Sequence, residues 1–74
     1  MPKLPVVSGE ELIKYLRRKG FVPKRQRGSH VLLKSPDGRR VTVPLYDEID
    51  RGLLLDILAE VRISRDEFMN EWEG

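Results

Sequence analysis

The stretch F-V-P-K-R-Q-R-G-S-H-V-L-L-K-S-P-D-G-R-R-V-T-V-P, residues 21–44, decides the fold of this 74-residue chain. It holds two turn signals, Gly-Ser at 28–29 and S-P-D-G at 35–38, between three runs of strand-forming residues. Because turns this short join neighbouring antiparallel strands, we expect a three-stranded meander. Its strands are expected at residues 21–27, 29–34 and 39–43.

Two prolines set limits on this sheet. Proline has no backbone N–H to donate to a neighbouring strand, so Pro23 restricts the first strand to a sheet edge or a bulge. Pro44 is expected to stop the third strand for the same reason.

Alternation along the strands separates a core face from an open face, because side chains two residues apart point the same way. The apolar set expected to face the helices is Val31, Leu33, Val41 and Val43. The opposite face then carries His30, Leu32, Lys34, Arg40 and Thr42. The only histidine, His30, is therefore expected on an open basic face, and this pattern disfavours the alternative of a buried structural histidine.

Helical signals flank the strands on both sides. Before them, the segment S-G-E-E places Ser8 and Glu11 as a capping box, and Gly20 is positioned to end the helix. After them, Asp50 is expected to cap a leucine-rich second helix.

A short final helix is indicated by S-R-D-E, which predicts a second capping box between Ser64 and Glu67. Its apolar side either joins the core or faces a partner, and helical spacing favours the core for Phe68, Met69 and Trp72.

The fold class that follows is α+β. We expect a single domain over residues 1–74, with the order α-β-β-β-α and a further short helix. Its antiparallel sheet has helices on one face only, an arrangement that resembles the double-stranded-RNA-binding domain (dsRBD).

Composition narrows the function classes. The chain has no cysteine, which excludes disulfides and thiolate zinc sites. It has no apolar run long enough to span a membrane, so we expect a soluble, cytoplasmic protein. Residues 14–40 contain ten Lys/Arg and one acid, a net charge of +9, whereas residues 47–74 contain nine acids and three arginines, a net charge of −6. Such asymmetry indicates a side that faces a polyanion.

A family resemblance rests on S-G-E-E-L-I-K-Y-L, R-Q-R-G-S-H, P-D-G-R-R-V-T-V-P and I-S-R-D-E-F, spread over about residues 8–68. In these segments the chain resembles HicA-type toxins of bacterial and archaeal toxin–antitoxin systems. The resemblance implies a dsRBD-like fold and an mRNA interferase that inhibits translation and is neutralised by a HicB-type antitoxin. It also implies that His30, in the G-S-H motif, is the catalytic histidine. Many members carry a second histidine after the third strand, and the nearby residue here is Tyr46.

The residues suit RNA cleavage without a metal. A histidine can take the proton from a 2′-hydroxyl, and cations can stabilise the charge that develops on the phosphate. Candidates for RNA or phosphate contact are Lys24, Arg25, Arg27, Lys34 and Arg40. Tyr46 is a candidate acid or RNA contact. We expect no metal and no cofactor, because no carboxylate pair accompanies His30 in the basic segment.

Two other readings stay open on the residues alone. The chain could be a non-catalytic RNA-binding module of dsRBD-like fold, in which His30 only contacts sugar or phosphate. It could also be a protein-interaction domain whose acidic C-terminal half binds a basic partner.

Overall fold

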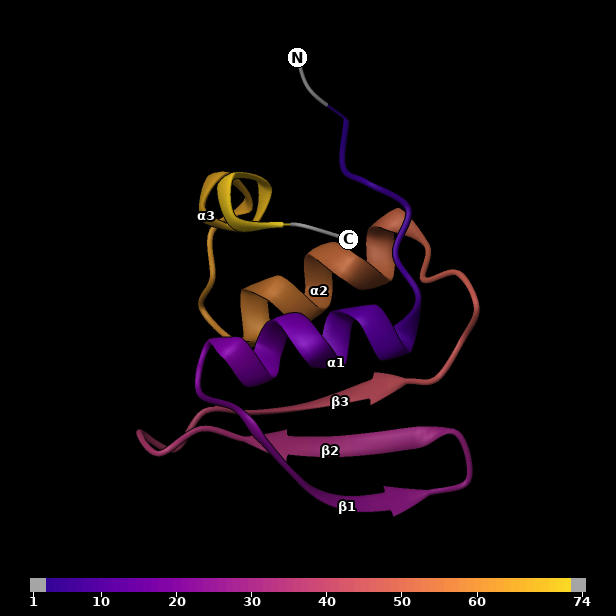
Figure 1. Ribbon diagram of the computed structural model, residues 1–74, viewed down its shortest axis with the longest axis vertical. Coiled ribbons are helices and arrows are strands. Elements are labelled where there is room, and N and C mark those ends of the chain that lie inside the picture. Colours follow the sequence, from indigo (N-terminus) through magenta and orange to yellow (C-terminus); the bar gives the residue numbers. More distant parts are fainter. Residues whose placement is uncertain (1–2, 73–74) are drawn as a thin grey trace.

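The computed structural model describes residues 3–72 and has three helices and a three-stranded sheet in that range (Figure 1). The elements, in order, are α1 (Gly9–Arg18), β1 (Val22–Arg27), β2 (His30–Lys34), β3 (Arg40–Pro44), α2 (Arg51–Glu60) and α3 (Arg65–Glu71). The predicted α+β class and element order are confirmed. The strands differ by one residue from their expected bounds, and Pro44 is the last residue of β3 rather than the residue beyond it.

The sheet is antiparallel, in the order β1-β2-β3. Val31 pairs with Val43 and Leu33 with Val41, and all four side chains are buried. The alternation argument is confirmed, because this apolar set is part of one core with both long helices. In Figure 1 the helices lie together on the β3 side of the view, with β1 at the far edge of the sheet.

The edge strand β1 carries a bulge. Pro23 lies opposite Leu33, but Leu32 lies opposite Arg25, so Lys24 is an extra residue at the shift in register. Both expectations for Pro23 are met, since it lies on an edge strand and beside a bulge. A bulge reverses the alternation beyond it. Arg25 and Arg27 therefore share the open face with Leu32 and His30, their partners on β2.

Helix α1 begins and ends as the sequence predicts. The Ser8 hydroxyl accepts from the Glu11 N–H at 3.1 Å, and the Glu11 carboxylate accepts from the Ser8 N–H at 3.0 Å. At the other end Gly20 has φ of 100°, a left-handed conformation that glycine adopts without strain.

The start of α1 touches the end of β3. The Gly9 N–H donates to the Tyr46 carbonyl at 2.8 Å. A Cβ at position 9 would lie only 1.9 Å from the Pro44 carbonyl oxygen. Only glycine allows the helix to begin this close to the sheet.

Helix α3 covers α1 and closes the core. Phe68 is fully buried and meets the Tyr15 ring edge-on at 5.1 Å, while Met69 and Trp72 are partly buried against the same core. The prediction that this apolar side packs in the core is confirmed for Phe68, and the other two residues lie at its margin.

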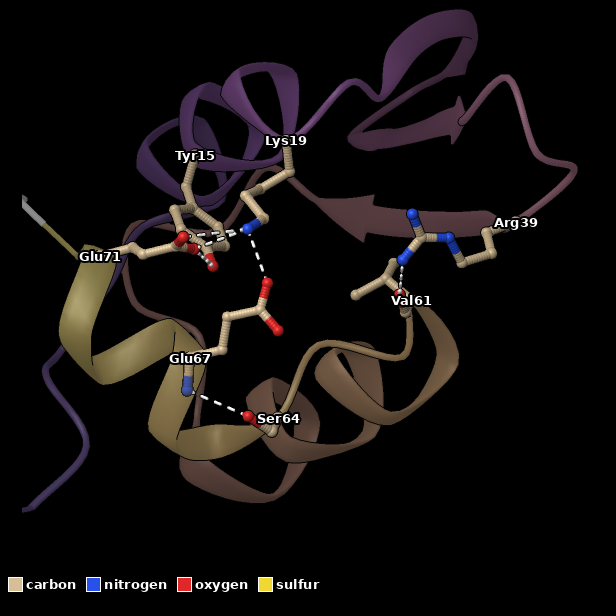
Figure 2. Close-up of polar contacts among 7 residues, drawn as sticks. All are labelled: Tyr15, Lys19, Arg39, Val61, Ser64, Glu67 and Glu71. Atoms are coloured by element: carbon tan, nitrogen blue, oxygen red, sulfur yellow. Dashed lines mark hydrogen bonds and ion pairs between the residues drawn. The ribbon is translucent and has the colours of Figure 1, made fainter.

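The predicted capping box of α3 forms only on its Ser64 side. The Ser64 hydroxyl accepts from the Glu67 N–H at 3.0 Å, but the Glu67 carboxylate binds the Lys19 ammonium at 2.6 Å (Figure 2). Lys19 also contacts Glu71 at 2.8 Å, and Glu71 accepts from the Tyr15 hydroxyl at 2.9 Å. A tertiary contact has therefore replaced a local one, and it ties α3 to α1.

Candidate functional site

His30 is the first residue of β2 and is exposed on the open face of the sheet. It lies opposite Arg27 on one neighbouring strand and Pro44 on the other. The expectation of an exposed rather than a buried histidine is correct. Placement on the middle strand allows groups from both outer strands to lie beside the imidazole.

A shallow pocket of about 170 Å³ surrounds this histidine. Its lining residues, here called the His30 pocket, are Arg25, Arg27, His30, Leu32, Arg40 and Thr42. The three arginines come from β1 and β3, so the sheet brings together one imidazole and three guanidinium groups from separate parts of the chain. The bulge in β1 is what directs two of those arginines to this face.

In the part of the chain that the structure describes, the side chains of the three arginines of the His30 pocket have no ion pair or hydrogen bond. Lys19 and Arg39, by contrast, are paired with acids. Arg39 binds Asp37 at 3.0 Å. It also donates to the Val61 carbonyl at 2.6 Å, as Figure 2 shows. The adjacent Arg40 points the other way along the strand alternation and lines the pocket instead.

Like charges face each other across the strands. Lys34 lies directly opposite Arg40 in the β2–β3 pair. Cross-strand pairs of like charge destabilise a sheet, and β1, β2 and β3 contain no acidic residue to offset them. An arrangement that weakens the isolated fold is one that a bound polyanion would stabilise.

Tyr46 borders the histidine. The two rings are 6.3 Å apart at an angle of 77°, an edge-to-face arrangement, and Tyr46 is 48% exposed. The contact of its carbonyl with Gly9 fixes the loop that carries it. The structure therefore places the sequence candidate for an acid or RNA contact next to His30.

The other two predicted cations lie in a separate place. Lys24 and Lys34 line a second recess on the sheet, here called the Lys24/Lys34 recess, with Val22, Ser35 and Pro36. Of the five cations proposed for RNA contact, three share the pocket with His30 and two do not.

Three residues that line or support the His30 pocket were not recognised as site residues from the sequence. Leu32 and Thr42 line the His30 pocket, and the strand alternation that placed them on this face could have included them. The role of Gly9 had no such signal, because its contact with β3 exists only in the folded chain.

No cluster of three or more His, Cys, Asp or Glu side chains suited to a metal ion occurs within residues 3–72. In that same range, every helix is too short or too polar to cross a membrane.

The fold and the pocket define a class of small α+β domain, with one open, strongly basic sheet face and a histidine at the start of its middle strand. A family model of the HicA toxin of bacterial toxin–antitoxin systems matches residues 9–63. The chain belongs to this HicA toxin family. A search of curated proteins gives no match.

Family membership supports a toxin role and implies a cognate antitoxin. The matched range runs from the first residue of α1 to the loop after α2 and includes the whole His30 pocket. Helix α3 lies beyond it, so the residues of α3 that contact Tyr15 and Lys19 are outside the matched region.

Proposed function

We propose that this HicA-family toxin is a metal-independent endoribonuclease that cleaves mRNA, inhibits translation and is neutralised by a HicB-type antitoxin. The observation that carries the proposal is the His30 pocket, in which one exposed imidazole lies among three arginines. Phosphate recognition suits arginine, whose forked donors match phosphate oxygens.

The proposed reaction begins at a ribose. The neutral imidazole of His30 removes the proton from a 2′-hydroxyl, and the 2′-oxygen attacks the adjacent phosphorus. The bond to the 5′-oxygen breaks, leaving a 2′,3′-cyclic phosphate on one product and a 5′-hydroxyl on the other. Arg25, Arg27 and Arg40 stabilise the charge on the phosphate oxygens in the transition state.

The leaving 5′-oxygen needs a proton. The phenol hydroxyl of Tyr46 is a candidate proton donor, because the Tyr46 and His30 ring centroids are 6.3 Å apart. The exposed ring of Tyr46 equally suits a stacking contact with an RNA base. If Tyr46 only stacks on a base, water supplies the proton. The acid role requires the Tyr46 hydroxyl, whereas the stacking role requires only its ring.

The chemistry of the products tests this function. The purified, antitoxin-free protein is incubated in EDTA with a long single-stranded RNA and with a fully 2′-O-methylated strand of the same sequence. We expect cleavage of the RNA alone, with cyclic-phosphate and 5′-hydroxyl ends, because the methylated strand has no nucleophile. Binding of both strands with cleavage of neither would favour the non-catalytic RNA-binding module.

A further inference from the structure

The Lys24/Lys34 recess has no part in the chemistry proposed above, yet it lies on the same sheet face. His30 and Lys34 are the two ends of β2, four residues apart. At roughly 3.3 Å per residue, this separates the imidazole from the lysine by about 13 Å along the strand. One phosphate group cannot contact both ends of β2.

The recess is built from residues that the fold brings together. Val22 pairs with Lys34 in the first rung of the β1–β2 ladder, and Lys24 is the extra residue of the bulge. Without the bulge, Lys24 and Arg25 would alternate between faces, whereas two bulge residues oppose a single partner. The bulge thus brings Arg25 to this face without removing Lys24, which lines the recess.

Apolar surface accompanies the charge. Val22 is 49% exposed in the recess, and Leu32 lies between the two sites on β2 and lines the His30 pocket. Unpaired bases can contact exposed apolar side chains, whereas the bases of an RNA duplex are enclosed in the helix. Cationic and apolar surface alternate along β2. This alternation fits an extended, single-stranded RNA better than an RNA duplex.

We propose that the Lys24/Lys34 recess is a distal phosphate site for the same RNA strand that the His30 pocket cleaves. The toxin would then favour a single-stranded substrate long enough to reach both ends of β2. That the ligand is RNA rests on the proposed function. The site itself is tested by binding affinity, which does not depend on cleavage.

The test compares strand lengths. Affinities are measured for 2′-O-methylated single strands, a dinucleotide and an octanucleotide, with the wild type and the double variant Lys24→Ala/Lys34→Ala. We expect the variant to lose on the order of tenfold affinity for the octanucleotide and to bind the dinucleotide as the wild type does. The slope of log affinity against log salt concentration should become shallower by about 0.7, since the recess is proposed to hold one phosphate and each phosphate contact with a single strand contributes about 0.7.

The matched control is Lys14→Ala/Arg17→Ala, which removes the same charge from exposed positions of α1, in the helical layer. It should leave both affinities unchanged, and thermal melts verify that each variant is folded. Equal losses for both strand lengths, or an equal loss in the control, would overturn the distal site in favour of a general charge effect. Unchanged RNA affinity with weaker antitoxin binding would assign the recess to the protein partner instead. Length-dependent binding without cleavage of RNA supports the distal site and overturns the proposed endoribonuclease.

Discussion

At the scale of single residues, the geometry beside His30 depends on a glycine at the start of α1. The Gly9 N–H holds the loop of Tyr46, and the absence of a side chain allows the helix to meet the Pro44 carbonyl. His30 could be identified from the sequence because strand alternation and the G-S-H motif both point to it. Gly9 could not, because nothing local distinguishes it from an ordinary first helical residue.

Gly9→Ala is expected to destabilise the protein by about 1–3 kcal/mol, the usual cost of forcing extra atoms into a packed site. The backbone of Pro44 and Leu45 would have to move, since the added Cβ meets main-chain atoms. Chemical denaturation measures the change. The control is Gly52→Ala in α2, where the nearest atom is 3.4 Å away and stability should rise by up to about 1 kcal/mol. Equal stability of Gly9→Ala and the wild type would contradict the close contact.

Tyr46→Phe separates the two roles of this tyrosine. If the ring stacks on a base, the phenylalanine variant keeps its activity and Tyr46→Ala raises KM, with a loss of about 1–3 kcal/mol in binding. If the hydroxyl is the acid, both variants lose kcat to a similar extent. Because the ring is exposed and meets His30 edge-on, we expect the stacking outcome, and steady-state kinetics of both variants decide it.

At the scale of elements, ion pairs of Lys19 with two acids tie α3 to the end of α1, in addition to the edge-on contact of the Tyr15 ring with α3. Lys19 lowers the pKa of Glu71, with a further contribution from the Tyr15 hydroxyl, and the two acids raise the pKa of Lys19. The sequence predicted α3 and its Ser64 cap but assigned Glu67 to that cap. Tertiary pairing prevailed because the local partner of Glu67 is one backbone N–H, whereas Lys19 offers a full charge.

Because the pKa of Glu71 is lowered in the folded protein, we expect the protein to lose stability as the pH becomes acidic. A carboxyl whose folded pKa lies below its ordinary 4.5 stabilises the fold above that pH and loses the contribution as the pH falls through the folded value. Lys19→Met should therefore be less stable than the wild type near neutral pH, with the difference shrinking below pH 4.5. Denaturation at several pH values measures it, and Lys14→Met is the control from the same helix. A difference that is constant with pH would contradict the ion pairs.

The bulge in β1 marks a second limit of prediction at this scale. Pro23 indicated an edge or a bulge, but not which residue would be extra. Because Lys24 is the extra residue, Arg25 and Arg27 share a face with His30. Strict alternation would have given Gln26 that place, and the register was settled only by pairing with β2.

At the scale of the whole molecule, the basic and acidic parts of the sequence lie on different sides of the fold. The cations of the open sheet face are separate from α2 and α3, which hold five of the twelve acids and lie away from β1 and β2 in Figure 1. Composition predicted a polyanion-facing side, and we propose that it is the face of the His30 pocket, where three arginines lie together. The contacts of Lys19 with Glu67 and of Arg39 with the Val61 carbonyl could not be predicted, because the partners are far apart in the sequence.

The most direct test of the central claim compares the wild type with His30→Ala on one long single-stranded RNA, in EDTA and without antitoxin. The account predicts that the variant loses about 10²-fold to 10⁴-fold in cleavage rate, as expected for removal of a general base, with RNA affinity nearly unchanged. Cleavage by His30→Ala at the wild-type rate would contradict the account.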